Sequence, residues 1–104
     1  MWRIFRFDSL ATRSKDWPKV RKEHLKIQPS CMACGSNVNP EVHHIIPVHV
    51  DPTKELDKTN LITLCDKYCH FIFGHLMNYK SWNPNVKSDC ELYLSKVQAR
   101  PIKN

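Results

Sequence analysis

Residues 31–75 carry most of the information about the fold, and they read CMACGSNVNPEVHHIIPVHVDPTKELDKTNLITLCDKYCHFIFGH. Four of the five cysteines lie here as two pairs, a CxxC at Cys31 and Cys34 and a CxxxC at Cys65 and Cys69. Four thiolates can enclose one zinc ion tetrahedrally, and Gly35 relieves the backbone of the first turn. A redox CxxC or buried thiols would leave the second pair unexplained. We therefore predict a structural zinc site that joins the two pairs.

The same stretch predicts a strand, a loop, a second strand and a helix. Residues 42–47 form a short β-branched run typical of a strand, and a polar, proline-containing loop follows through Thr59. Residues 61–64 (LITL) predict the second strand. Asp66 is placed to cap a helix over residues 67–78.

The segment before the zinc pairs predicts a basic helix. Residues 1–12 are apolar and basic, which suits a short strand or an arm. Residues 13–27 (RSKDWPKVRKEHLKI) have helical periodicity, and Pro18 is tolerated in a first turn. The side chains expected to face inward are those of Trp17, Val20, His24 and Ile27. We interpret His24 as a structural histidine whose polar atoms are satisfied.

The C-terminal segment predicts a turn followed by one more helix. Ser88 and Glu91 match a capping box, and Pro101 would end the helix. The core positions expected on it are Cys90, Leu94 and Val97. Because no linker separates these regions, we expect one domain over residues 1–104, made of parts 1–30, 31–80 and 81–104.

The charge of the chain favours a polyanionic partner. The formal net charge is +6 at pH 7, from 16 Lys and Arg against 10 Asp and Glu. Nucleic acid suits such a balance first and an anionic membrane surface second. The sequence has no apolar run of about 18 residues that could span a membrane. Residues 1–7 are too short and too rich in arginine for a secretory signal, so we expect a protein of the reducing cytoplasm.

Histidines at defined positions accompany the zinc pairs. His43 and His44 are adjacent in the first strand, Asn60 follows the loop, and His70 comes directly after Cys69. This order of residues resembles that of the HNH (ββα-metal) endonuclease family, in particular its small CxxC-containing bacteriophage members. The motifs that carry the resemblance are CMAC, VHHIIP, TNLITLC and the adjacent CH. It implies a small α+β domain with a ββα-metal core, a structural four-cysteine zinc site and flanking helices.

The resemblance also implies an activity, the metal-dependent hydrolysis of DNA phosphodiester bonds. Carried over by position, His44 is the general base, and Asn60 holds the His44 ring or the loop beneath it. His43 and His70 bind one catalytic divalent ion, which is Mg²⁺, Mn²⁺, Ni²⁺ or Zn²⁺. The family often has Asp where this chain has His43, and imidazole shifts the preference from Mg²⁺ toward softer ions.

Two further histidines are less constrained by their position. His75 lies five residues after His70, which on a regular α-helix turns it by about 140° from His70. Either Gly74 loosens the helix and His75 becomes a third metal ligand, or His75 faces DNA or solvent. We interpret His49, in the loop, as exposed.

The resemblance implies DNA as the partner. Phage packaging proteins are a second class of partner that it suggests. The predicted phosphate-binding residues are Arg13, Lys15, Lys19, Arg21, Lys22 and Lys26. We expect nicking with low sequence specificity, in a role in phage DNA packaging, homing or restriction and in the cytoplasm of a bacterial host. The alternative is a zinc-stabilised DNA-binding module without catalysis.

Overall fold

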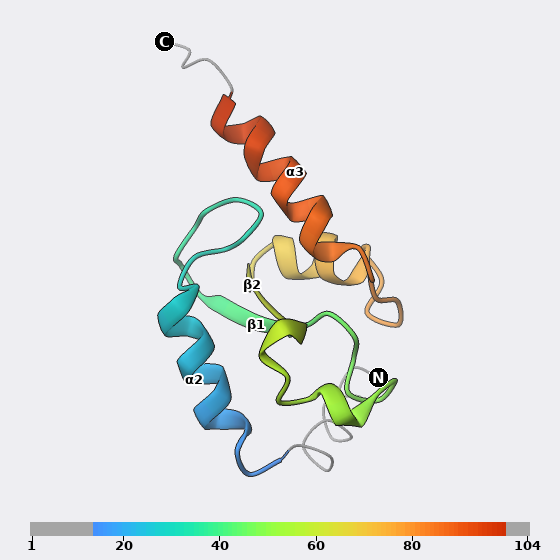
Figure 1. The fold of residues 1–104 in the computed structure, drawn as a ribbon. Coiled ribbons are helices and arrows are strands. Elements are labelled where there is room, and N and C mark those ends of the chain that lie inside the picture. The colour runs from blue at the N-terminus through green and yellow to red at the C-terminus, as the bar shows by residue number, and fades with distance from the viewer. Residues whose placement is uncertain (1–13, 100–104) are drawn as a thin grey trace.

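A two-stranded antiparallel sheet forms the framework in the computed structural model, which describes residues 14–99 (Figure 1). Strand β1 spans Pro40–His44 and strand β2 spans Leu61–Cys65. His43 lies opposite Ile62, and the last residue of β1 lies opposite the first residue of β2. All five residues of β2 are buried, whereas β1 is buried only at its last two positions. The buried end of β1 is thus the end that carries the paired histidines.

Helices cover the sheet and give the small α+β domain that the sequence predicts. Helix α2 (Trp17–Ile27) packs on both strands, and so does the π-helix η3 (His70–Gly74). Helix α3 (Val86–Ala99) packs on η3 and extends away from the sheet (Figure 1). The core combines buried residues of the first cysteine turn, of β2 and of α3, namely Cys31, Ala33, Ile62, Leu64, Val86 and Cys90. None of the described helices has the length and apolar character needed to cross a membrane.

The predicted strands exist, but their bounds differ from 42–47 and 61–64. After His44 one in-register hydrogen bond remains, from the Ile45 N–H to the Asn60 carbonyl at 2.8 Å. The pairing then stops because the next N–H, that of Ile46, donates to the Asn60 side chain at 2.8 Å. β2 continues to Cys65, whose neighbour Asp66 donates its N–H to the carbonyl of Asn39 at 3.0 Å. The loop between them contains two short 3₁₀ turns, η1 (Pro52–Lys54) and η2 (Lys58–Asn60).

The predicted helix over 67–78 is much shorter and has a different hydrogen-bonding pattern. Residues 66–68 form a turn, and Cys69 rather than Asp66 is the N-cap of η3. The regular π-helical part ends at Gly74. Leu76 and Met77 follow with left-handed φ values of 55° and 64°, which close the helix. The cap prediction was wrong because the backbone N–H of Cys69 donates to the thiol of Cys65 instead, at 3.5 Å.

The flanking helices are confirmed, with corrections at their ends. α2 begins at Trp17 rather than 13, with Pro18 in its first turn. Ile27, which was expected to face inward, is 79% exposed. α3 begins at Val86, so Ser88 lies inside it and caps nothing; its hydroxyl donates to the carbonyl of Asn85. The expected core residue Val97 is 38% exposed, since α3 projects past the domain there. Residues 1–12, Arg13 and Pro101 lie outside the described residues.

Candidate metal sites and active site

The two cysteine pairs meet at the edge of the sheet. The Sγ atoms of Cys31, Cys34, Cys65 and Cys69 all lie within 4.8 Å of one another. The first pair occupies a turn in which Gly35 has a φ of +79° and donates its N–H to the carbonyl of Cys31. The second pair spans the end of β2 and the N-cap of η3. Four thiols in this arrangement can hold a tetrahedral metal ion, and the prediction that the two pairs come together is confirmed.

Backbone N–H groups point at the sulfur atoms of this four-cysteine cluster, as thiolates require. The N–H of Cys34 donates to Sγ of Cys31 at 3.4 Å. Burial alone would raise the pKa of the Cys65 thiol, but hydrogen bonds from the N–H groups of Cys69 and Tyr68 lower that pKa to about 7. Cys90 lies outside the cluster, and burial raises the pKa of its thiol to about 12. This agrees with the interpretation of Cys90 as a packed core residue.

A second group of possible metal ligands consists of His43, His70 and His75. One ring nitrogen of each lies within 4.8 Å of the others, and Nδ1 of His43 is 3.1 Å from Nε2 of His70. His43 comes from β1, whereas His70 begins η3 and His75 directly follows it. A π-helix closes its hydrogen bonds from i to i+5 instead of i to i+4. On an α-helix, a spacing of five residues would turn His70 and His75 away from each other. In this π-helix the same spacing brings them together, which favours the interpretation of His75 as a ligand.

The three imidazoles of this histidine cluster are held in the neutral form that a metal needs. Burial, followed by the neighbouring histidine charges, lowers the pKa of His43 to about 2. Burial and the charge of His75 lower the pKa of His70 to about 4, and burial also lowers the pKa of His75. Nδ1 of His75 donates to the carbonyl of Ser81 at 2.9 Å, which leaves the Nε2 lone pair for a ligand.

One nitrogen of the His43 ring has no partner, whereas the other, Nδ1, is the one that faces His70. Among the side chains of residues 14–99, His43 Nε2 is a buried polar atom without a hydrogen-bond partner. The contacts therefore support a donor set of His43 Nδ1, His70 Nε2 and His75 Nε2, and the unsatisfied Nε2 is a cost of burying the ring. Gly74 makes room for this ring, because a Cβ there would lie 3.0 Å from Cε1 of His43. The close approach of η3 to β1 thus depends on a glycine.

His44 occupies a different environment from its neighbour. Since side chains alternate along a strand, it points to the opposite face of β1 from His43. Its Nε2 lies 2.9 Å from the carbonyl oxygen of Glu55 and must donate to it, because a carbonyl can only accept. In the neutral ring the lone pair is then on Nδ1. The Trp17 ring packs on His44 with centroids 4.5 Å apart.

Asn60 is buried and ties the loop together through backbone groups. Its Nδ2 donates to the carbonyls of Ile46 and Lys54 at 3.0 and 3.2 Å, and its Oδ1 accepts the N–H of Ile46. Of the two predicted roles, these hydrogen bonds correspond to holding the loop rather than the His44 ring. That loop includes Glu55, whose carbonyl fixes His44.

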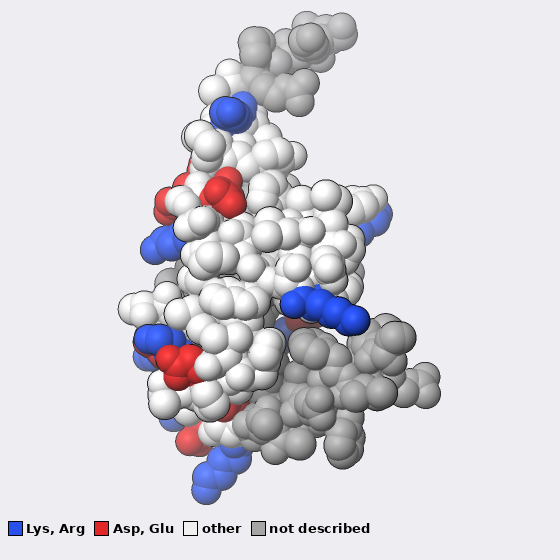
Figure 2. Space-filling view, turned by 90° about the vertical axis from the view of Figure 1, so that its right-hand side faces the viewer, with Lys and Arg blue, Asp and Glu red and all other residues white. Residues whose placement is uncertain are grey.

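The predicted phosphate-binding residues are divided between the faces of α2. At 100° per residue, Lys19, Lys22 and Lys26 share one exposed face, turned away from the sheet. Lys15, before the helix, is exposed as well. Arg21 instead lies 4.0 Å from Glu41. On the side of the molecule away from α2, basic and acidic side chains are scattered around a largely uncharged centre (Figure 2).

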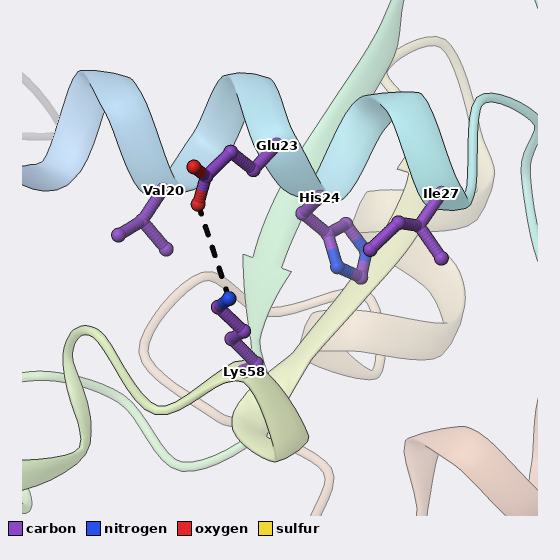
Figure 3. A pocket seen from close by; sticks show the side chains of 5 residues that line it. All are labelled: Val20, Glu23, His24, Ile27 and Lys58. Atoms are coloured by element: carbon purple, nitrogen blue, oxygen red, sulfur yellow. Dashed lines mark ion pairs between the residues drawn. The ribbon is translucent and has the colours of Figure 1, made fainter.

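A shallow pocket between α2 and η2 lies apart from both clusters. Its walls come from Val20, Glu23, His24 and Ile27 of α2 and from Lys58, whose ammonium is 4.0 Å from the Glu23 carboxylate (Figure 3). His24 donates from Nε2 to Gln28 Oε1 at 3.2 Å, which agrees with a structural histidine. His49, outside this pocket, is exposed as expected.

Several residues that build the site escaped the sequence analysis. Glu55 and Ser81 act through backbone carbonyls, and a carbonyl leaves no signature in the residue type. Gln28 joins α2 to the sheet, because its Oε1 accepts the N–H of Thr63 at 2.7 Å and its carbonyl accepts that residue's hydroxyl. Asn83 donates to the backbone carbonyl of a residue in η3. The predicted turn before the C-terminal helix contains Asn83, but its residue type did not reveal this contact.

Comparison with known proteins gives one match. The family model for HNH endonuclease matches residues 31–72. The matched segment begins at the first cysteine of the four-cysteine cluster and includes both strands, Asn60 and His70, but it stops before His75. No curated protein and no solved structure matches the chain.

Proposed function

We propose, from the premise that residues 31–72 belong to the HNH endonuclease family, that this chain hydrolyses phosphodiester bonds in DNA. The observation that carries the proposal is the convergence of three imidazoles, those of His43, His70 and His75, on one point. His44 follows His43 in β1 and donates from Nε2 to the Glu55 carbonyl. Three protein ligands leave a coordination position open, whereas a structural site is closed by four. The adjacent four-cysteine cluster already supplies a site of the structural type.

The chain's own residues define what each metal site would hold. The four-cysteine cluster would bind a structural Zn²⁺. His43, His70 and His75 would hold one divalent ion that neutralises charge on the phosphate, with a coordination position left for substrate. Three imidazoles favour Mn²⁺, Ni²⁺ or Zn²⁺ over Mg²⁺, which prefers oxygen ligands.

His44 would remove a proton from the attacking water. Its Nε2–H donates to the Glu55 carbonyl, so Nδ1 accepts the proton and the carbonyl stabilises the charged ring that results. Asn60 would act indirectly on His44, because its three hydrogen bonds hold the loop that contains the Glu55 carbonyl. A general base of this kind contributes about 10²- to 10⁴-fold to the rate.

The exposed face of α2 would bind the DNA backbone. Lys15, Lys19, Lys22 and Lys26 are exposed and lie outside the site, so they would position the duplex without reading its sequence. We propose nicking of low sequence specificity, in the cytoplasm of a bacterial host. The phage-like resemblance suggests a role in DNA packaging, homing or restriction.

A plasmid nicking assay tests this function. Protein stripped of metal and reloaded with zinc would be incubated with supercoiled plasmid in Mg²⁺, Mn²⁺, Ni²⁺ or Zn²⁺, beside His44→Ala. We expect open circles from the wild type and a loss of about 10²-fold or more in the variant, with DNA binding retained. Binding without cleavage in every metal would instead identify a zinc-stabilised DNA-binding module.

A further inference from the structure

We infer that Trp17 is a positioning residue for His44, and that the beginning of α2 therefore belongs to the active site. The inference rests on the proposed function. Trp17 precedes the segment that matches the family, so the match says nothing about it. Neither its place in the helical pattern nor the motif predicted what its ring would contact.

The His44 ring is held on two sides by groups from different parts of the chain. The Trp17 ring lies at a centroid distance of 4.5 Å and an interplanar angle of 33°, which is the range of attractive ring pairs. The Glu55 carbonyl accepts from Nε2 at 2.9 Å. His44 is only 8% exposed to solvent. Together the two contacts restrict both the tilt of the imidazole and its rotation about the Cβ–Cγ bond.

Glu55 connects the two groups that contact the His44 ring. Its carbonyl accepts from His44, while its carboxylate accepts the backbone N–H of Ser14 at 2.7 Å. Ser14 accepts the N–H of Trp17 through its own carbonyl, at 3.1 Å. The 7% exposed Glu55 thus joins the loop beside the base to the start of the helix whose aromatic ring covers the base.

The consequence is a mechanical link between DNA binding and the base. α2 presents Trp17 to His44 on its inner face and Lys19, Lys22 and Lys26 on its outer face. No residue of α2 is fully buried. The contacts of Trp17 therefore help to hold the first turn of α2 against the sheet. A duplex held by the outer face would be placed relative to the same element that orients the base. A displacement of about 1 Å in such a group can cost about 10²-fold in rate.

The test compares Trp17→Ala and Trp17→Phe with a matched control, Val20→Ala, one turn later on the same face of α2. We expect Trp17→Ala to lower single-turnover cleavage at saturating DNA by about 10- to 100-fold with unchanged DNA affinity and zinc content. Trp17→Phe should restore most of the rate. Val20→Ala should lower thermal stability but leave the rate near that of the wild type. Equal rate losses in Trp17→Ala and Val20→Ala would overturn the inference.

A double-mutant cycle separates positioning from general packing. If Trp17 acts through His44, Trp17→Ala should cause no further loss of cleavage in the His44→Ala background. The same fold-loss in both backgrounds would contradict the inference. Wild-type activity in His44→Ala would instead remove the proposed function.

A readout that needs no cleavage completes the design. By NMR, the His44 Nε2 proton should exchange slowly with water in the wild type and markedly faster in Trp17→Ala, with Trp17→Phe close to the wild type. Unchanged exchange in Trp17→Ala would overturn the inference even if the protein cut no DNA.

Discussion

The four-cysteine cluster and the histidine cluster are built on the same frame but differ in what they leave open. Cys69 and His70 are neighbours in the chain, yet one joins the four thiols and the other the three imidazoles. Four thiolates complete a tetrahedral site and leave no position for a substrate. Three neutral imidazoles leave one position open. The number of donors, more than their location, distinguishes a site that can hold the fold together from one that can do chemistry.

The two clusters also differ in how their donors are oriented. The thiols are oriented mainly by nearby backbone, such as the N–H of Cys34 on Cys31. The imidazoles depend on more distant features, namely the Ser81 carbonyl for His75 and the space above Gly74 for His43. Small changes in packing should therefore disturb the histidine cluster first.

The largest expected effect is the loss of the fold when the four-cysteine cluster is broken. Structural zinc sites contribute on the order of 10 kcal/mol or more, which is comparable to the whole stability of most small domains. We expect Cys31→Ser combined with Cys34→Ser to give an unfolded chain by circular dichroism. The matched pair His43→Ala with His75→Ala should still bind one zinc ion and melt cooperatively. A cysteine variant that melts like the wild type would show that the four-cysteine cluster is not needed for the fold.

Removing one imidazole should abolish the second metal site but not the first. Removing a residue that only hydrogen-bonds to a metal ligand typically weakens metal binding by about 10- to 100-fold. Since His70 would be a ligand itself, we expect His70→Ala to weaken binding of the second ion by more than that. Metal analysis by mass spectrometry should find two ions bound to the wild type and one to this variant. Retention of two ions would show that His70 is not a ligand.

The two glycines offer a smaller and selective test. Gly74→Ala places a methyl group against His43, and such overpacking costs about 1–3 kcal/mol. Gly35→Ala meets nothing within 4 Å but keeps a φ of +79°, which costs about 1–2 kcal/mol. We expect comparable falls in thermal stability, with weakened binding of the second ion only in Gly74→Ala. Equal metal affinities in both variants would contradict the packing argument.

The smallest effect should come from the lysines of α2, which lie outside both clusters. Lys19→Ala, Lys22→Ala and Lys26→Ala combined should weaken DNA binding and lower the slope of its salt dependence by about one for each lysine that binds a phosphate. Each single α2 substitution is also made by itself, and Lys96→Ala on α3 serves as its control of equal charge. If it weakens binding as much as a single α2 lysine, the DNA surface is not confined to α2.

The sequence by itself determined which donors exist and how they group along the chain. The cysteine spacings and the adjacent histidines are local features, so the four-cysteine site and the strand–loop–strand order followed from them. The element bounds did not, because Asn60 and Cys65 redirect backbone N–H groups through side-chain contacts that propensities do not contain.

The tertiary structure alone decided how the histidines are used. Whether His75 faces His70 depends on an i to i+5 turn, which forms where Gly74 packs against His43 from a strand far away in the chain. The surroundings of His44 come from Trp17 and from the carbonyl of Glu55, on opposite sides of it in the sequence. Residue spacing describes neighbours within one element, whereas a catalytic geometry is set by contacts between elements that only folding brings together.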